Sequence, residues 1–519
     1  PSVRTFLRRM ETPRWMAGRK VSVLDLVDDG RSLAQALAEV AQLPPSERGE
    51  ALARVVRPVI EVATADPKDL CPNTGLVRLD IWRYFRHTWS LEYRSTPGRT
   101  LFFLIRNAAR PMAPVMGIAS LANATLQLKI RDNWVGWSAS EIARSFGDDP
   151  QGVLAALLRT VRVALGEIRK TDLMKQVGPA RGEALEQKLE QIAADALERR
   201  KDALEDYRRK KERGEAVPPL KNLPRFGNGE YNWREASEDL LFVGKRARAL
   251  ADLFYAERIL SEYEASEPQF ADVLRREGSP ESARALRALS IAAREIRKVG
   301  LASRMLELNV CGAVPPYRDL LVGKLVALAA ASADVASAYA ARYRDQHSEI
   351  ASQMAGKAVY RDASPCVITT TSLYAAVSSQ YNRLKLRLDD GRVVRWQELE
   401  HRRAPSEAAG PGEPPKQSSD NWTAGKGTGH LSDDTVQALR DLTIARSRLR
   451  RVNNVFGEGQ SPRLRQVREG LGELRLDPDY FLRHSMPRRV YGLELFPGAR
   501  RTLCLTLPAT APRIPSDAL

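Results

Sequence analysis

The chain has 519 residues, of which 43% are hydrophobic, and this size predicts about two to four domains with a sizeable core. No run of about 18 apolar residues occurs, and the basic N-terminus lacks the apolar stretch of a secretory signal, so we expect no transmembrane helix and no export. The four cysteines form no CxxC pair and the five histidines are scattered, so we expect neither disulfides nor a metal site. These features predict a protein of the reducing cytoplasm with no metal or other cofactor.

The charge balance is strongly basic. Lysine and arginine total 81, aspartate and glutamate total 64, and the net charge is +17, with most of the basic residues being arginine. A guanidinium group binds phosphate through two parallel hydrogen bonds and stacks on bases, so this composition favours a nucleic acid as partner. A basic protein with no special affinity for polyanions is the alternative interpretation.

The first part of the chain changes from helical to mixed patterns. Residues 1–68 are predicted to be an N-terminal helical region, since apolar residues recur about every 3.6 positions over 21–43 and a second helix over 43–63 can begin at the Pro44–Pro45 pair. Residues 69–140 are predicted to be the first part of an α/β core. There, 75–89 fits either a strand or the start of a helix, and two strands follow, at 100–106 and from about 114.

Residues 141–300 have the pattern of long, charged helices, which we interpret as a helical insertion lobe within the core. Residues 180–215 repeat glutamate and Lys or Arg four positions apart, a pattern that supports exposed helix. A loop rich in proline and glycine interrupts the helices at 217–235.

The last third of the chain returns to mixed patterns. Residues 301–400 are predicted to be the second part of the core, with a strand at 304–314, helices at 315–332 and 333–354, and a β-branched strand beginning near 364. Residues 401–430, rich in Pro, Gly and Ser, are predicted to be a flexible loop. Residues 431–519 form a basic C-terminal region with a helix, a loop and a final pair of strands at 488–507.

Two segments of the second core part carry candidate polar sites. After the strand at 304–314, a turn leads into a helix with Gly323 and Lys324 in its first turns, and a helix N-terminus can bind phosphate. Leu325 follows Lys324, so this is not a Walker A loop, and ordinary strand–helix packing is the alternative. Threonines and serines near 369–379, followed by Tyr381, could bind phosphate or reflect β-propensity alone.

The stretch RDNWVGW, residues 131–137, places an Arg–Asp pair beside two tryptophans. We predict that it caps a strand and that Arg131 and Asp132 support the fold. The alternative is a cleft wall in which Asp132 handles a proton and a tryptophan stacks on a base.

The C-terminal region holds the candidate nucleic-acid ligands. Clustered arginines neutralise phosphates, and asparagine can reach sugar or base edges. The alternative is a solvated helix surface whose arginines pair with Glu458, Glu469 and Glu473. The predicted nucleic-acid-binding residues are Arg446, Arg448, Arg450, Arg451, Asn453, Arg463, Arg465, Arg488 and Arg489.

Four stretches, RDNWVGWS, AVPPYRDLLVGKLVALAAAS, ITTTSLYAAVSSQYNRLKL and FGEGQSPRLRQVREGL, together resemble the DruA-like family of the Druantia anti-phage defence system. The resemblance implies a role in defence against invading DNA beside other subunits, such as a large helicase. It implies no established reaction. The family's compact members continue directly from GWS, so the helical block at 141–300 departs from the family pattern.

The order of strand, turn, helix and strand over 304–383 is also similar to the N-acetyltransferase-like fold, in which the turn before the helix binds a pyrophosphate. The fold class is therefore predicted as α+β, with a mixed β-sheet core resembling that fold, a large helical insertion and a basic C-terminal region. If the protein is an enzyme of this kind, Asp132, Tyr317, Lys324, Ser378 and Tyr381 should meet in one cleft.

Three functions remain open from the sequence. The first is a DNA-binding subunit of a defence complex, and the second is an acyltransferase-like enzyme acting on a nucleobase, nucleotide or protein. The third is a scaffold that binds a partner protein through the helices of 141–300.

Overall fold

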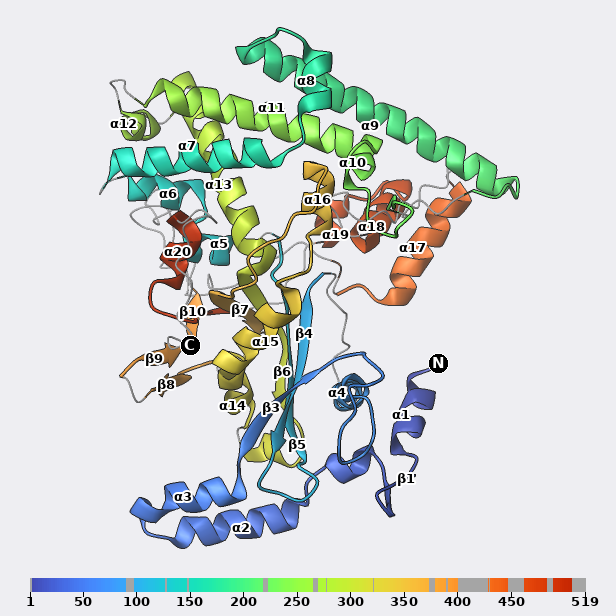
Figure 1. Ribbon diagram of the computed structural model, residues 1–519, viewed down its shortest axis with the longest axis vertical. Helices are drawn as coiled ribbons and strands as arrows, with labels where there is room; N and C mark the ends of the chain where they lie inside the picture. Colours follow the sequence, from blue (N-terminus) through green and yellow to red (C-terminus); the bar gives the residue numbers. More distant parts are fainter. Residues whose placement is uncertain are drawn as a thin grey trace.

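The core of the protein is a mixed β-sheet, shown in the computed structural model of Figure 1. The structure describes residues 2–89, 98–126, 128–146, 149–217, 223–264, 269–276, 278–320, 322–372, 379–388, 391–399, 428, 430–446, 462–482 and 489–505. The strands are β3 (Pro58–Ala63), β4 (Thr100–Asn107), β5 (Val115–Asn123), β6 (Met305–Ala313), β7 (Val367–Ser372), β10 (Gln397–Leu399) and β11 (Arg489–Glu494). Their order is β10-β11-β7-β6-β5-β4-β3, in which β6 and β7 are parallel and all other neighbours are antiparallel.

Both faces of this sheet are covered, which explains why β4 and β5 carry apolar side chains on either side. One face packs against α2 (Gly30–Gln42), α14 (Val322–Ala329) and α15 (Ala333–Tyr343), around Phe103 and Leu308. The other face packs against α4 (Arg78–His87), where Trp82 is buried and its indole N–H donates to the Ala119 carbonyl at 2.9 Å. The prediction of an α+β fold with a mixed sheet is therefore confirmed.

The N-terminal region is helical only in part. Helices α1 (Val3–Glu11), α2 and α3 (Pro45–Val55) lie here, with the short hairpin of β1 (Arg14–Met16) and β2 (Arg19–Val21) and the turn η1 (Val23–Leu26). The predicted second helix ends at Val55, and β3 follows it as an edge strand of the sheet. Pro58 opens this strand, where a missing N–H is tolerated, and the β-branched Val59, Ile60 and Val62 favour extended backbone.

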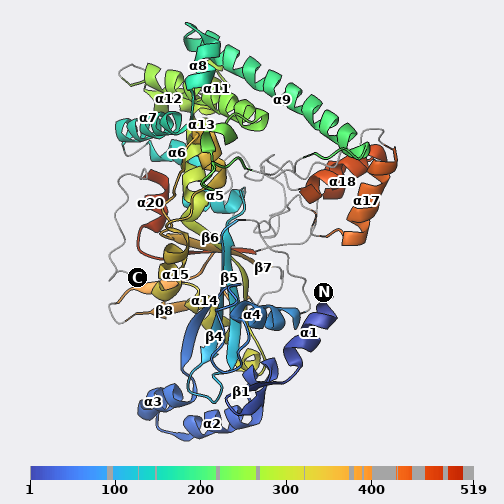
Figure 2. The same ribbon diagram turned by 45° about the vertical axis from the view of Figure 1, so that its right-hand side comes forward.

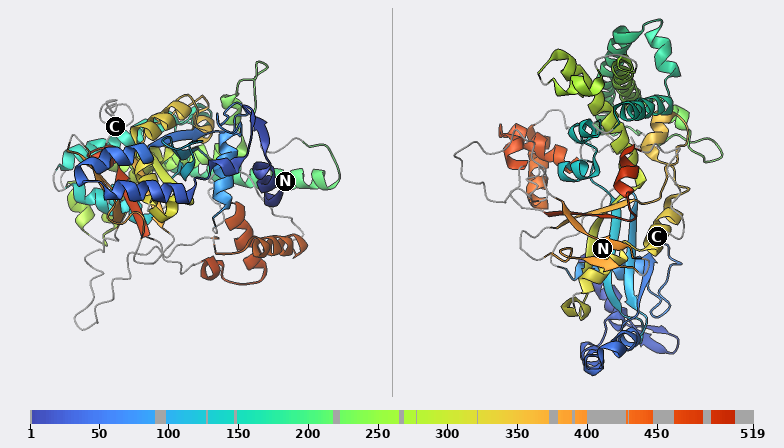
Figure 3. Two further views of the ribbon diagram at one scale, coloured as in Figure 1. Left: turned by 90° about the horizontal axis from the view of Figure 1, so that it is seen from below. Right: turned by 90° about the vertical axis from the view of Figure 1, so that its left-hand side faces the viewer.

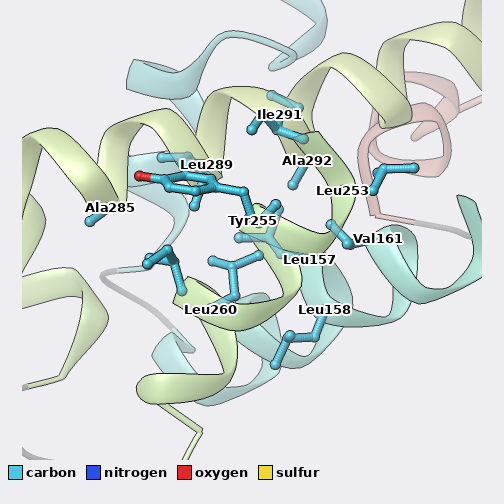
Figure 4. Close-up of a cluster of buried hydrophobic side chains, with 14 of the residues drawn as sticks. Leu157, Leu158, Val161, Leu253, Tyr255, Leu260, Ala285, Leu289, Ile291 and Ala292 are labelled. Atoms are coloured by element: carbon cyan, nitrogen blue, oxygen red, sulfur yellow. The ribbon is translucent and has the colours of Figure 1, made fainter. Parts of the chain in front are cut away.

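From Ala139 to Ser303 all elements formed by the described residues are helical. They are α6 (Ala139–Ser145), α7 (Pro150–Glu167), α8 (Thr171–Val177), α9 (Gly182–Glu212), α10 (Trp233–Ala236), α11 (Leu240–Glu262), α12 (Phe270–Arg275) and α13 (Pro280–Ser303). Most of them enclose a hydrophobic core of their own, part of which Figure 4 shows around Leu157, Leu289 and Tyr255. The boundaries 141 and 300 for this lobe stay a prediction.

One buried ion pair joins two helices of the lobe. Arg246 on α11 is fully buried and its guanidinium donates to both carboxylate oxygens of Asp172 on α8, at 2.8 and 2.7 Å. Burial alone would raise the pKa of Asp172, but the hydrogen bonds and charge of Arg246 outweigh it and lower that pKa. The pair therefore ties α8 to α11 in its ionised form.

The C-terminal part contains elements of both kinds. A small unit of α17 (Asp433–Arg446), α18 (Pro462–Glu473) and α19 (Pro478–Leu482) has its own core of Val436, Leu439 and Val467, and stands beside the sheet in Figures 2 and 3. The predicted final strand pair is wrong in its second member, because β11 pairs with β7 and β10 and the chain then forms α20 (Ala499–Leu505). Gly498 turns the chain there with a φ of 78°, a conformation that favours glycine.

Three shorter elements complete the fold: α5 (Lys129–Val135), α16 (Glu349–Ala355) and the turn η2 (Tyr317–Leu320). A second small hairpin joins β8 (Lys385–Arg387) and β9 (Val393–Arg395). Within the described residues, no single helix is long and apolar enough to cross a membrane. The consecutive helices α14 and α15 have the required length and apolar character only when they are taken together, and they are bent by 46° relative to each other.

The lobe core generates a stability prediction. Leu289 on α13 is fully buried among the lobe side chains, whereas Leu286 on the same helix is 39% exposed. We expect Leu289→Ala to lower the free energy of unfolding by about 2–5 kcal/mol, because it leaves a cavity. Leu286→Ala is the matched control and should change it by less than about 1 kcal/mol. Equal urea midpoints for the two variants would show that Leu289 is not a core residue.

Candidate functional site

The RDNWVGW corner is a helix and not a strand end. Its first five residues, 131–135, belong to α5, and Gly136 ends that helix in the left-handed conformation with a φ of 95°. A β-branched residue could not take this position without strain, which explains the glycine between Val135 and Trp137. Sequence reasoning failed here because a seven-residue helix is too short to show a helical period.

Asp132 lies between two guanidinium groups. Arg131 is fully buried and donates to the Asp132 carboxylate at 2.9 and 2.6 Å, and to the Thr125 carbonyl at 2.6 Å. Arg297 on α13 donates to the second carboxylate oxygen at 3.3 Å. The three side chains form a joint between α5, the end of β5 and the lobe helix α13. This arrangement fits a supporting carboxylate better than a free general base.

Trp134, within α5, and Trp137, just after its end, each pack against a glycine. Trp134 lies over Gly492 of β11, and the Arg500 guanidinium stacks on its ring at 4.7 Å. Trp137 lies over Gly300 of α13, and its indole N–H donates to the Leu503 carbonyl at 3.2 Å. An added Cβ at either glycine would collide with the ring, so both contacts are close packing, of Trp134 on β11 and of Trp137 on α13.

The remaining candidates of the enzyme hypothesis fall into two places. Tyr317 is buried at the far end of β6, where its hydroxyl accepts from Asn107 at 2.8 Å and donates to Asp28. Burial, together with the bond to Asp28, raises the pKa of Tyr317. Asp132 follows the opposite end of β5, which pairs antiparallel with β6, so the sheet holds Asp132 and Tyr317 apart. Ser378 lies outside the described residues.

Lys324 and Tyr381 do lie together. The Lys324 ammonium donates to the Asn382 carbonyl at 3.0 Å and contacts that of Gln380 at 3.5 Å. Tyr381 is buried beside Cys311, and burial raises the pKa of the tyrosine well above its ordinary value and that of the Cys311 thiol to about 12. Both groups are therefore held in their neutral forms at neutral pH.

The parallel strands next to this cluster separate. β6 and β7 pair at Met305–Glu307 with Val367–Thr369, and the register between them goes no further. Beyond this point the Gln380 amide donates to the Cys311 carbonyl at 3.0 Å, and the Thr370 hydroxyl donates to the Leu308 carbonyl at 2.7 Å. Side chains thus satisfy carbonyl groups that a longer ladder would have paired.

A groove of about 1810 Å³ lies between the helical lobe and the end of the sheet. Its cationic lining is partly neutralised, since Arg294 pairs with Asp252 at 2.6 Å, Lys298 with Glu295 at 2.6 Å and Arg361 with Glu167 at 2.7 Å. The charged lining residues are Arg99, Arg200, Arg294, Arg297, Lys298 and Arg361, with Glu235, Glu238, Asp239 and Glu349. The groove has room for an extended ligand, but its charge does not by itself select a polyanion.

The predicted nucleic-acid ligands that the structure describes lie on three elements, α17, α18 and β11. Arg446 on α17 is exposed and donates to the Glu473 carbonyl at 3.0 Å, and Arg463 on α18 pairs with Asp433. Arg465 is half-buried on α18 and also has a partner. Arg489 lies apart from these on β11 and pairs with Glu398 at 3.1 Å. Arg448, Arg450, Arg451, Asn453 and Arg488 lie outside the described residues.

Sequence reasoning missed two features. Arg297, the second partner of Asp132, is 165 residues away along the chain, and no local pattern could pair them. The β8–β9 hairpin had a signal, since Leu alternates with Lys and Arg before an Asp–Gly turn sequence.

Together these features define an α+β protein with a mixed central sheet and a helical lobe that lies between β5 and β6 in the sequence. Its candidate catalytic residues, where the structure describes them, do not meet in one cluster. A family model described as Druantia protein DruA matches residues 65–147 and 283–504, more than half of the chain. The chain belongs to the DruA family. The segment between the two matched parts, 148–282, contains α7 to α12.

One curated relative, Druantia protein DruA from Escherichia coli (strain UMEA 4076-1), is 30% identical over 199 residues. The alignment covers 38% of this chain and 41% of the relative, so it spans less than half of the relative's length. No solved structure matches the chain, and the likeness to N-acetyltransferases therefore receives no support from a structural neighbour.

The joint around Asp132 generates a prediction. Asp132→Asn leaves the buried Arg131 guanidinium without a carboxylate, and removal of one partner from a buried ion pair costs about 3–5 kcal/mol. We therefore expect this variant to unfold at a lower urea midpoint, which is measured by tryptophan fluorescence. The control is Glu50→Gln, since Glu50 and its partner Arg54 are 87% and 78% exposed and such pairs contribute little. A midpoint for Asp132→Asn equal to that of the control would contradict the structural role.

Proposed function

We propose that this protein is a nucleic-acid-binding, most simply DNA-binding, component of a Druantia anti-phage defence system that acts in the cytoplasm with other subunits, among them a helicase. Membership in the DruA family supports the defence role. The observation that carries nucleic-acid binding is the surplus of basic over acidic side chains. Even if each of the 64 carboxylates paired with one cation, 17 of the 81 basic side chains would have no acidic partner.

The ion pairs of the described residues agree with this proposal in one respect. Buried guanidiniums, such as Arg131 and Arg246, are neutralised by aspartates, so the surplus charge is displaced to the surface. Ion pairs with an exposed carboxylate, such as Arg463 with Asp433, are weak in water, and a phosphate can compete for the arginine.

The C-terminal arginines are the first residues to test. We expect the combined variant Arg448→Glu, Arg450→Glu and Arg451→Glu to bind DNA of any sequence more weakly. The slope of log K against log salt should become shallower by about 0.9 for each phosphate that the variant no longer neutralises. Fluorescence anisotropy of a labelled duplex over a salt series measures both. Binding by the unaltered protein that is absent, or that does not change with salt, would contradict the proposed function.

A second candidate is an acyltransferase-like enzyme, and one observation favours it. In an otherwise antiparallel sheet, the central parallel strands β6 and β7 separate after three paired residues, and α14 follows β6 through a short turn. This arrangement supports the likeness to the N-acetyltransferase-like fold. Lys324 and Tyr381 lie beside the separation, but Gln380 bridges it, so a ligand between the strands would have to displace that side chain.

This candidate is tested by titration of acetyl-CoA in a calorimeter. The unaltered protein should give a saturable heat of binding, and Lys324→Met should reduce it. The Lys324 ammonium belongs to the first turn of α14, and the N-terminal end of a helix is the end that can bind phosphate. Lys357→Met, at an exposed lysine outside this region, is the control. The absence of heat with the unaltered protein would remove the acyltransferase candidate.

A further inference from the structure

We propose that the outer face of the β8–β9 hairpin is a contact surface for the phosphate backbone of a nucleic acid. This face, here called the cationic ribbon, carries Lys385, Arg387 and Arg395. The inference rests on the proposed nucleic-acid binding and assigns part of it to a segment other than the C-terminal arginines.

The strand register places the three cations on one side. Lys385 is opposite Arg395, Leu386 is opposite Val394, and Arg387 is opposite Val393. Because successive side chains of a strand point to opposite faces, Lys385, Arg387 and Arg395 share a face. All three are exposed, and Val393, which completes this face, is 50% exposed.

The hairpin is anchored in the main core. Leu384 and Trp396 flank the two strands and are buried, and the Trp396 indole N–H donates to the Ala327 carbonyl of α14 at 3.2 Å. The Trp396 ring also contacts that of Tyr381 at 5.0 Å. An isolated two-stranded hairpin is only marginally stable in water, so this anchoring is what holds the ribbon in place. Figure 1 shows β8 and β9 extending from the sheet on the side away from α17 and α18.

The charges on the ribbon oppose its own stability. The backbone N–H of Trp396 donates to the Leu384 carbonyl, and the backbone N–H of Leu388 donates to the Arg392 carbonyl. Lys385 and Arg395 therefore occupy the intervening, non-hydrogen-bonded pair, where opposite side chains lie closest and like charges repel. No described acidic residue forms an ion pair with Lys385, Arg387 or Arg395, and Asp389 and Asp390 lie outside the described residues.

An anionic partner would remove this repulsion, and the geometry points to a polyphosphate. Lys385 and Arg387 project about 7 Å apart along one strand, with Arg395 across from them, so the ribbon presents several cations to a surface of repeated negative charge. A two-stranded ribbon is also narrow enough to enter the major groove of a duplex. The face has one exposed apolar side chain, Val393, which is too little for insertion into a lipid surface.

The test compares two variants with the same change in net charge. In the ribbon variant, Lys385, Arg387 and Arg395 are replaced by glutamate. In the control variant, Arg159, Arg199 and Arg248 are replaced by glutamate; these are exposed on α7, α9 and α11 and form no ion pair with a described residue. Anisotropy with a labelled duplex and a labelled single strand measures binding over a salt series, and circular dichroism checks folding.

We expect the ribbon variant to bind at least tenfold more weakly than the control variant and to have a salt slope that is shallower by about two to three units. If the ribbon variant does not fold, the glutamine substitutions at the same three positions, which remove the repulsion, supply the measurement. Equal weakening in both variants, or none in the ribbon variant, overturns the ribbon while the proposed function stands. No binding by the unaltered protein overturns the proposed function itself. Equally tight binding of polyglutamate and DNA to the ribbon would assign it to an acidic protein instead.

Discussion

The antiparallel pairing of β5 with β6 holds the two halves of the core together. It runs from Gly117 opposite Ala313 to Asn123 opposite Leu306, although the whole helical lobe lies between the two strands in the sequence. The free-energy cost of closing so long a connection grows only slowly with its length. The lobe also has its own hydrophobic core, so the sheet does not depend on it for burial. A large insertion is therefore tolerated at the end of β5, provided that its last helix, α13, leads directly into β6.

The joint around Asp132 explains how the lobe is fixed at that connection. Arg131 and Asp132 belong to α5, which follows β5, and Arg297 belongs to α13, which precedes β6. The carboxylate thus bridges the segment that enters the lobe and the helix that leaves it. Gly300 and Gly492 allow the two tryptophans of the same corner to pack closely on α13 and β11. The sequence predicted that Arg131 and Asp132 support the fold, with catalysis as the alternative, and their contacts form a structural connection between sheet and lobe.

Local patterns in the sequence predicted the central strands well, because β4, β6 and β7 are runs of apolar or β-branched residues with clear turns between them. They failed where tertiary contacts decide the structure. The edge strand β3 continues an apolar spacing that also suits a helix, and α5 and α20 are too short for a period to emerge. The polar partners were out of reach for another reason. Asp132 and Arg297, or Lys324 and the carbonyl of Asn382, meet only after the sheet has formed.

The surplus of basic residues favours a polyanionic partner, and the partners of the individual cations indicate where on the fold that surplus is available. Several of the guanidiniums that line the groove already have a carboxylate partner, and Arg446, Arg463 and Arg489 of the C-terminal region have a carboxylate or carbonyl partner, so their charge is partly neutralised within the fold. The cationic ribbon differs, because its cations face one another across a hairpin and repel. It also lies within the part of the chain that matches the DruA family, whereas 148–282 of the lobe does not. A binding surface on the ribbon therefore lies in the part of the chain that the family model covers, while one on 148–282 of the lobe would lie outside it.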